Sequence, residues 1–177
     1  MRKFKQVMLF VMVGSLLAIT SCSKDDDGGS SGNAASGTLT ATVDGDSFKS
    51  LKISSSATLA NDGNNLIIIA SNSDGNAFSF TVLGYDGIGT YNLGGGVNIL
   101  NTASYTETDV DLANPVNSTT NIWQAPYDDT LAGEIKVSED TDSNIKGTFS
   151  FTCKNVGGDG SIKDITSGSF NLSKQVL

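Results

Sequence analysis

The chain has 177 residues, no histidine, and 19 acidic against 11 basic side chains, which gives a net charge of −8. The absence of histidine excludes Ser–His and Cys–His nucleophilic machinery and most zinc and copper sites. The acidic surplus argues against nucleic acid as a partner, because phosphate contacts need clustered Lys and Arg side chains.

The first 21 residues have the pattern of a cleaved secretory signal. A short basic start precedes an apolar run from Val7 to Ile19. This run is too short to span a hydrocarbon core with ease, because a spanning helix needs about 20 apolar residues. We therefore predict a signal peptide over residues 1–21, with an uncleaved anchor helix as the alternative.

The residues after the apolar run resemble a lipid-attachment signal. Residues 19–22, Ile-Thr-Ser-Cys, are similar to the lipobox of bacterial lipoproteins, and the resemblance implies that the Cys22 thiol is acylated. Residues 25–27 are three aspartates, which resemble the acidic export signal of Bacteroidota surface lipoproteins; a solvated acidic spacer is the alternative. The resemblance implies a protein anchored in outer-membrane lipid and facing the extracellular side, and two or three acyl chains would hold it stably.

Residues 22–36 are predicted to be the acylated cysteine and an acidic Gly/Ser-rich tether, and residues 37–177 a single domain. Once the signal is removed, eight basic side chains remain against 19 acidic ones, a net charge of −11. Anionic headgroups repel such a surface, so the acyl chains are expected to hold the protein at the membrane.

The body of the chain is built on a two-residue period. Residues 66–69 are apolar throughout, which favours a central strand covered on both faces. Clean alternation marks four further strands, at residues 78–82, 134–138, 148–154 and 169–172. Turn residues lie between such runs, at residues 61–64, 73–76, 85–87 and 157–160. The pattern predicts an all-β fold, a single antiparallel β-sandwich of about eight to ten short strands.

Three segments of the chain share a strand-and-turn pattern: TATVDGDSFKS near the start, YDGIGTYNLGG in the middle, and IKGTFSFTCKN with ITSGSFNLS at the end, which carry a GTFSF…SGSFN signature. Together they resemble an uncharacterised family of Bacteroidota surface lipoproteins. The resemblance supports the fold and the location and brings no reaction with it. Gly147 and Gly168 of the signature have a physical interpretation, because a bulge or a close strand approach would exclude a Cβ atom there.

Cys153 shares the parity of Phe149 and Phe151, so we expect it to be buried. With Cys22 acylated, it has no partner for a disulfide. A catalytic role for Cys153 is disfavoured, because the neighbouring Lys154 points to the opposite face of the strand.

Carboxylates are the remaining source of chemistry. Five of them lie in the two most polar connections: Glu107, Asp109, Asp111, Asp128 and Asp129. A pair of them could carry glycoside hydrolysis, a remote alternative, but solvated surface acids are the simpler interpretation. Asp140, Asp142 and Asn144 match the first ligand positions of a calcium loop, which then lacks its glycine and its last glutamate; a hairpin turn is favoured. We expect no catalytic residue, metal or cofactor.

Trp123 is the one candidate for a ligand-binding platform. If residues 121–124 form a strand with Ile122 inward, Trp123 is displayed on the surface, flanked in sequence by Tyr105 and Tyr127. Such an aromatic could stack on a sugar ring. The alternative is that Trp123 belongs to the core, as most tryptophans largely do.

The sequence therefore predicts a non-enzymatic, surface-exposed, lipid-anchored module that binds an extracellular glycan or protein. The alternative is a structural accessory protein of an outer-membrane assembly. An aromatic platform at Trp123 would favour the first function, and a long unprotected edge strand would favour the second.

Overall fold

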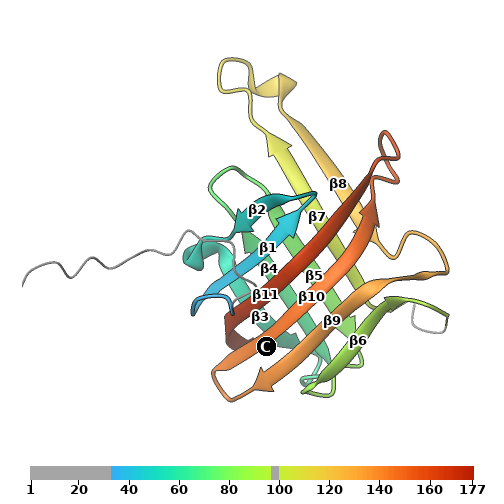
Figure 1. Ribbon diagram of the computed structural model, residues 1–177. Coiled ribbons are helices and arrows are strands. Elements are labelled where there is room, and N and C mark those ends of the chain that lie inside the picture. Colours follow the sequence, from blue (N-terminus) through green and yellow to red (C-terminus); the bar gives the residue numbers. More distant parts are fainter. Residues whose placement is uncertain (1–32, 97–99) are drawn as a thin grey trace, which may run out of the picture. The chain divides into compact units, whose positions relative to one another are not determined.

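The computed structural model describes residues 33–96 and 100–177 (Figure 1). The expected signal peptide and most of the expected tether, including Cys22, lie outside the described residues. The strands are β1 (Thr38–Val43), β2 (Asp46–Lys49), β3 (Ser55–Ala60), β4 (Asn65–Ser71), β5 (Ala77–Leu83), β6 (Gly89–Gly94), β7 (Thr102–Asp109), β8 (Thr119–Ala125), β9 (Leu131–Asp140), β10 (Asn144–Lys154) and β11 (Ile162–Val176). Two 3-10 turns, η1 (Lys52–Ser54) and η2 (Pro115–Asn117), complete the elements. The helices described are too short to cross a membrane.

All eleven strands belong to one sheet, in the order β2-β1-β11-β3-β4-β5-β7-β8-β10-β9-β6, with a further pairing of β11 to β10. The all-β prediction is confirmed. The strands outnumber the expected eight to ten, and one pairing is parallel, between residues 174–176 of β11 and residues 57–59 of β3. β11 is also long, at 15 residues, and its two ends pair with different neighbours.

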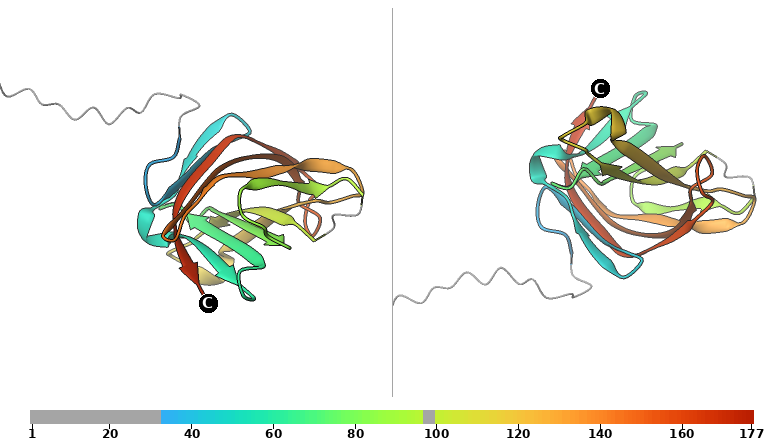
Figure 2. Two further views of the ribbon diagram at one scale, coloured as in Figure 1. Left: turned by 90° about the horizontal axis from the view of Figure 1, so that it is seen from below. Right: turned by 90° about the horizontal axis from the view of Figure 1, so that it is seen from above.

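Because β11 passes from one set of strands to the other, the sheet folds over into two facing layers (Figure 2). We call β2, β1, β11, β10, β9 and β6 the first layer, and β3, β4, β5, β7 and β8 the second layer. Phe78 and Phe80 of the second layer meet Phe149 of the first, with ring centroids 5.5 and 4.8 Å apart and edge-to-face geometry. Aromatic pairs of this kind add about 0.5–1.5 kcal/mol beyond the area that they bury.

The two halves of the C-terminal signature pair with each other. Gly147 lies opposite Phe170, and Phe149 lies opposite Gly168, across the β10–β11 ladder. A Cβ atom on Gly168 would stand 2.5 Å from the Phe149 ring, and one on Gly147 would overlap the Phe170 ring. Each glycine thus makes room for the phenylalanine in the other half of the signature, which confirms the expected close approach of the two strands. Both glycines lie within their strands rather than before them.

The apolar run in β4 is covered on one face only, so the expectation of two covered faces is wrong. Leu66 and Ile68 are buried in the core, whereas Ile69 is 50% exposed on the outer face of the second layer. The position accepts an isoleucine because β-branched side chains favour the strand conformation, and a single exposed apolar side chain lowers stability little.

Candidate functional site

Trp123 is a core residue, which confirms the alternative interpretation, and the hypothesis that it is displayed on the surface is wrong. Its side chain is 5% exposed, while the neighbouring Ile122 is 46% exposed and faces outward. The indole Nε1 donates a hydrogen bond of 2.9 Å to the hydroxyl oxygen of Ser161. The Tyr105 ring packs beside it, with centroids 6.1 Å apart, and is itself buried.

The three aromatic residues proposed as a binding set do not form one. Tyr127 lies in the connection after β8, partly buried, and makes no ring pair with Tyr105 or Trp123 among the described residues. Since Tyr105 and Trp123 turn their faces into the protein, the arrangement offers no aromatic surface to a sugar.

Lys163 closes this end of the core. Its ammonium lies 4.6 Å from the centroid of the Trp123 ring and forms ion pairs with Glu107 at 3.0 Å and Asp44 at 3.5 Å. Burial alone would lower the pKa of Lys163, but the carboxylates of Glu107 and Asp44 raise it above its ordinary value. Lys163 is the second residue of β11, Glu107 lies on β7 and Asp44 follows β1, so the cluster ties the two layers together.

Beyond this cluster, β7 and β8 continue as a hairpin that projects from the body of the domain (Figure 1). We call residues 106–122 the β7–β8 arm. Its tip displays two large apolar side chains: Leu112 is 89% exposed and Val116 is 91% exposed. The tip is nonetheless ordered, because the Asp111 carboxylate accepts hydrogen bonds of 2.9 Å from the backbone amides of Ala113 and Asn114.

The arm has an open edge on β8. On one side β8 pairs with β7 at seven positions, from Thr119 to Ala125. On the other side it pairs with β10 only at Gln124. The residues of β8 before Trp123 are exposed on both faces, and the strand sequence TTNIWQA contains no proline and no charge. Charges, prolines and short length are the usual protections of an edge strand, so this edge is unprotected.

The edge strand β2 is built differently. It has four residues and carries a charge at each end, Asp46 and Lys49. A short charged edge of this kind resists pairing with another chain. Within the same domain, β2 is therefore protected against pairing with another chain, whereas β8 is not.

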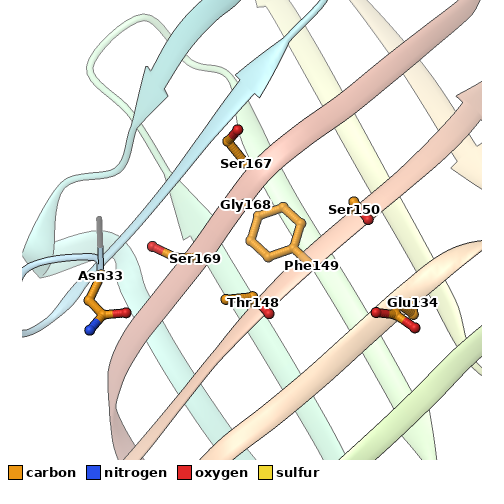
Figure 3. Close-up of a pocket in the computed structure, with 8 residues that line it drawn as sticks. All are labelled: Asn33, Glu134, Thr148, Phe149, Ser150, Ser167, Gly168 and Ser169. Atoms are coloured by element: carbon orange, nitrogen blue, oxygen red, sulfur yellow. The ribbon is translucent and has the colours of Figure 1, made fainter. Parts of the chain in front are cut away.

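A polar hollow of about 240 Å³ opens on the outer face of the first layer (Figure 3). The residues that line it are Asn33, Glu134, Thr148, Phe149, Ser150, Ser167, Gly168 and Ser169. The Ser169 hydroxyl already accepts a hydrogen bond of 2.8 Å from the backbone amide of Ala34. The other polar side chains of the lining are three hydroxyls, one amide and one carboxylate, which could hydrogen-bond a small polar group.

The five candidate carboxylates are used in structural contacts or lie apart. Glu107 is paired with Lys163. Hydrogen bonds from Asn114 and Ala113 lower the pKa of Asp111, and hydrogen bonds from Thr130 lower the pKa of Asp128. A general acid in glycoside hydrolysis needs a raised pKa, so these shifts have the wrong direction for that role. Asp109 and Asp129 are exposed.

The Asp140–Asn144 segment is the hairpin turn between β9 and β10. One oxygen of Asp140 accepts a hydrogen bond of 2.8 Å from Lys174, and the other accepts one of 2.9 Å from the Tyr85 hydroxyl. The Thr141 amide closes the turn on the carbonyl of Asn144. Within residues 33–96 and 100–177, no group of three or more His, Cys, Asp or Glu side chains is arranged to hold a metal ion.

Cys153 is fully buried between the layers, as its parity predicted. Burial raises the pKa of its thiol to about 12. The thiol therefore stays protonated and unreactive near neutral pH.

The fold and these contacts define an all-β domain whose distinctive surfaces are an open strand edge and an apolar hairpin tip. The sequence model of the family described as "Domain of unknown function (DUF6252)" matches residues 35–172, and the chain belongs to this family. Comparisons with curated proteins and with solved structures gave no match.

Proposed function

We propose that this protein is a non-enzymatic surface lipoprotein of the Bacteroidota outer membrane that docks a partner protein through the β7–β8 arm. The open edge of β8 is the observation that carries the proposal. An extended segment of a partner can pair with such an edge, so that backbone hydrogen bonds supply affinity and neighbouring side chains supply selectivity.

The tip of the arm suits the same partner. Leu112 and Val116 would enter an apolar groove beside the added strand, which removes their exposed surface from water. Glu107, Asp109 and Asp111 are the charges nearest the tip, and residues 102–135 contain no Lys or Arg. The matching groove would therefore carry basic residues at its rim.

Anchoring through lipid on Cys22 supports this role. The acyl chains would fix one end of the protein, and the acidic tether would leave the domain free to meet a partner at the outer surface. The function is that of a structural accessory to an outer-membrane assembly, because the surface available is a strand edge with an apolar tip. The buried position of Trp123 removes the aromatic platform that an adhesion module for glycans would have used.

Site-specific photocrosslinking in cells that make the lipoprotein tests the proposal. A photoreactive residue at Asn121 should give one discrete protein adduct, and the same residue at Ser138, exposed on β9, should give none. Ile122→Lys, which adds a charge to the edge, should abolish the adduct without changing the amount of protein. Equal adducts at both positions, or an adduct that survives Ile122→Lys, would contradict docking through the edge.

A further inference from the structure

The outer face of the second layer is uncharged from one side to the other. The ladders align its outward residues in rows across the strands, such as Ser56–Ile69–Ser79–Ser104–Gln124. The other rows contain Thr58, Ile67, Thr81 and Thr102; Ala60, Asn65 and Leu83; Ser71, Ala77, Thr106 and Ile122; and Thr108 with Thr120. No residue in these rows is buried. We call this surface the neutral face.

The composition of the neutral face contrasts with the charge of the protein. Residues 33–177 contain seven lysines against 16 acidic residues, a net charge of −9. The outer face of the first layer includes Lys49, Glu134, Lys136 and Asp164. Two copies of such a chain repel one another over most of their surfaces, and the neutral face is where this repulsion is weakest.

The size of the neutral face also fits an interface. Strand spacings of about 4.8 Å and steps of about 6.8 Å between outward residues give each position roughly 33 Å². The 18 positions in the five rows therefore have a footprint of roughly 600 Å². Each partner contributes roughly 800 Å² to a standard interface, and the footprint of the neutral face is about three quarters of that area.

The side chains suit a second β-sheet better than a sugar. They are Ser, Thr, Ala and Ile with a few amides, and none of them is aromatic. Small and β-branched side chains allow two sheets to pack face to face at about 10 Å, with hydroxyls bonding across the contact. Ile69 and Ile122 supply apolar area that the partner sheet would cover.

We infer that two copies of this protein associate through their neutral faces, as a symmetric face-to-face dimer of second layers. The contact is isologous, so each residue that favours or opposes it counts twice. This association uses the side chains on the outer face of the sheet, whereas partner docking uses the backbone edge of β8 and the tip of the arm. The two surfaces meet at Ile122, so Ser79 and Ser104, which lie away from the arm, distinguish them.

Sedimentation and light scattering of residues 31–177, a compact unit with its own core, test the inference. Wild type should approach twice the monomer mass as concentration rises. Ser79→Asp with Ser104→Asp, cross-strand neighbours at the centre of the face, should weaken the dimer by about 100-fold because the new charges oppose their copies. Thr148→Asp with Thr166→Asp adds the same charge to exposed positions of the first layer and should leave the dimer intact.

Three results would overturn the inference. The first is a wild type that stays monomeric at the highest concentration reached. The second is an equal effect of the two double variants, which would show that net charge alone governs association. The third is a dimer that survives Ser79→Asp with Ser104→Asp but dissociates in Ile122→Lys, because this would place the contact at the β8 edge. Circular dichroism of each variant confirms that the fold is intact.

Discussion

The two layers bury the same kind of residue inward and present different residues outward. Inward, both carry large aromatic side chains, such as Phe78 in β5 and Phe149 in β10. Outward, the first layer alternates lysines and acids with hydroxyls, while the second layer has hydroxyls, amides and isoleucines without a charge. Folding requires only that the outer face be compatible with water, and charged residues meet that requirement as well as hydroxyls do. Folding therefore does not require the second layer to be uncharged, and the association inferred above gives its composition a role.

The largest effects are expected where the two layers are alike. Trp123→Ala and Phe149→Ala should each lower the free energy of unfolding by about 3–5 kcal/mol, because each leaves a cavity in the shared core. Denaturant titration measures both values, and tryptophan emission of the wild type should be blue-shifted and resistant to acrylamide. Ile122→Ala, beside Trp123 but outward, should cost less than about 1 kcal/mol. A similar cost for Ile122 and Trp123 would contradict the inward assignment.

A smaller effect should distinguish the tight ladder of the first layer from its loops. Gly168→Ala should lower the free energy of unfolding by about 1–3 kcal/mol, because the added Cβ meets the Phe149 ring. Gly157→Ala, in the β10–β11 connection with open space around it, should change stability by less than about 0.5 kcal/mol. Thermal unfolding of the pair gives the difference, and equal melting temperatures would contradict the close approach.

The buried thiol between the layers predicts a dependence on alkaline pH. The pKa of Cys153 is about 12 in the folded protein against 9.0 for the free group. Above pH 9 the unfolded chain loses this proton before the folded chain does, so stability should fall as the pH rises from 9 toward 12. Comparison of wild type with Cys153→Ala at pH 8 and pH 10 isolates the effect from other groups. Rapid maleimide labelling of the folded domain at pH 8 would contradict the burial.

The smallest effects on stability should come from exchanging the two outer faces. Lys136→Ser in the first layer and Ser79→Lys in the second should each change the free energy of unfolding by less than about 0.5 kcal/mol, because both positions are exposed. Denaturant titration at low protein concentration, where any dimer is dissociated, measures this. A loss of several kcal/mol in either variant would show that the outer composition serves folding after all.

The period-two pattern predicted the strands well because alternation records burial directly. Phe149, Phe151 and Cys153 point inward as expected. Polar residues separate them, so only one of the two faces of the strand is apolar and can be the buried one. At β8 the same rule was ambiguous, because Ile122 and Trp123 are both apolar. The structure settles the choice through Ser161 and Lys163, which hold Trp123 from a distant part of the chain.

The surfaces proposed for binding could not be read from the sequence for a different reason. An open edge is defined by the neighbour that a strand lacks, and β8 reads as an ordinary strand until its pairing is known. The neutral face likewise emerges only when the register brings residues of five strands into rows. The prediction that residues 66–69 are covered on both faces is wrong for a related reason. Apolar residues point to both faces of this strand, but the fold covers only one of them.

The pairing of β1 with β11 has a mechanical consequence for a protein anchored as proposed. The chain enters the domain beside Ser169, and β1 runs from Thr38, opposite Asn171, to Val43, opposite Ile165. The arm lies at the far end of β1, where Asp44 reaches Lys163. Tension between the lipid anchor and a partner on the arm would pull β1 along its own axis. Its hydrogen bonds to β11 and β2 would then share the load together, as a shear clamp, rather than break one after another as in peeling.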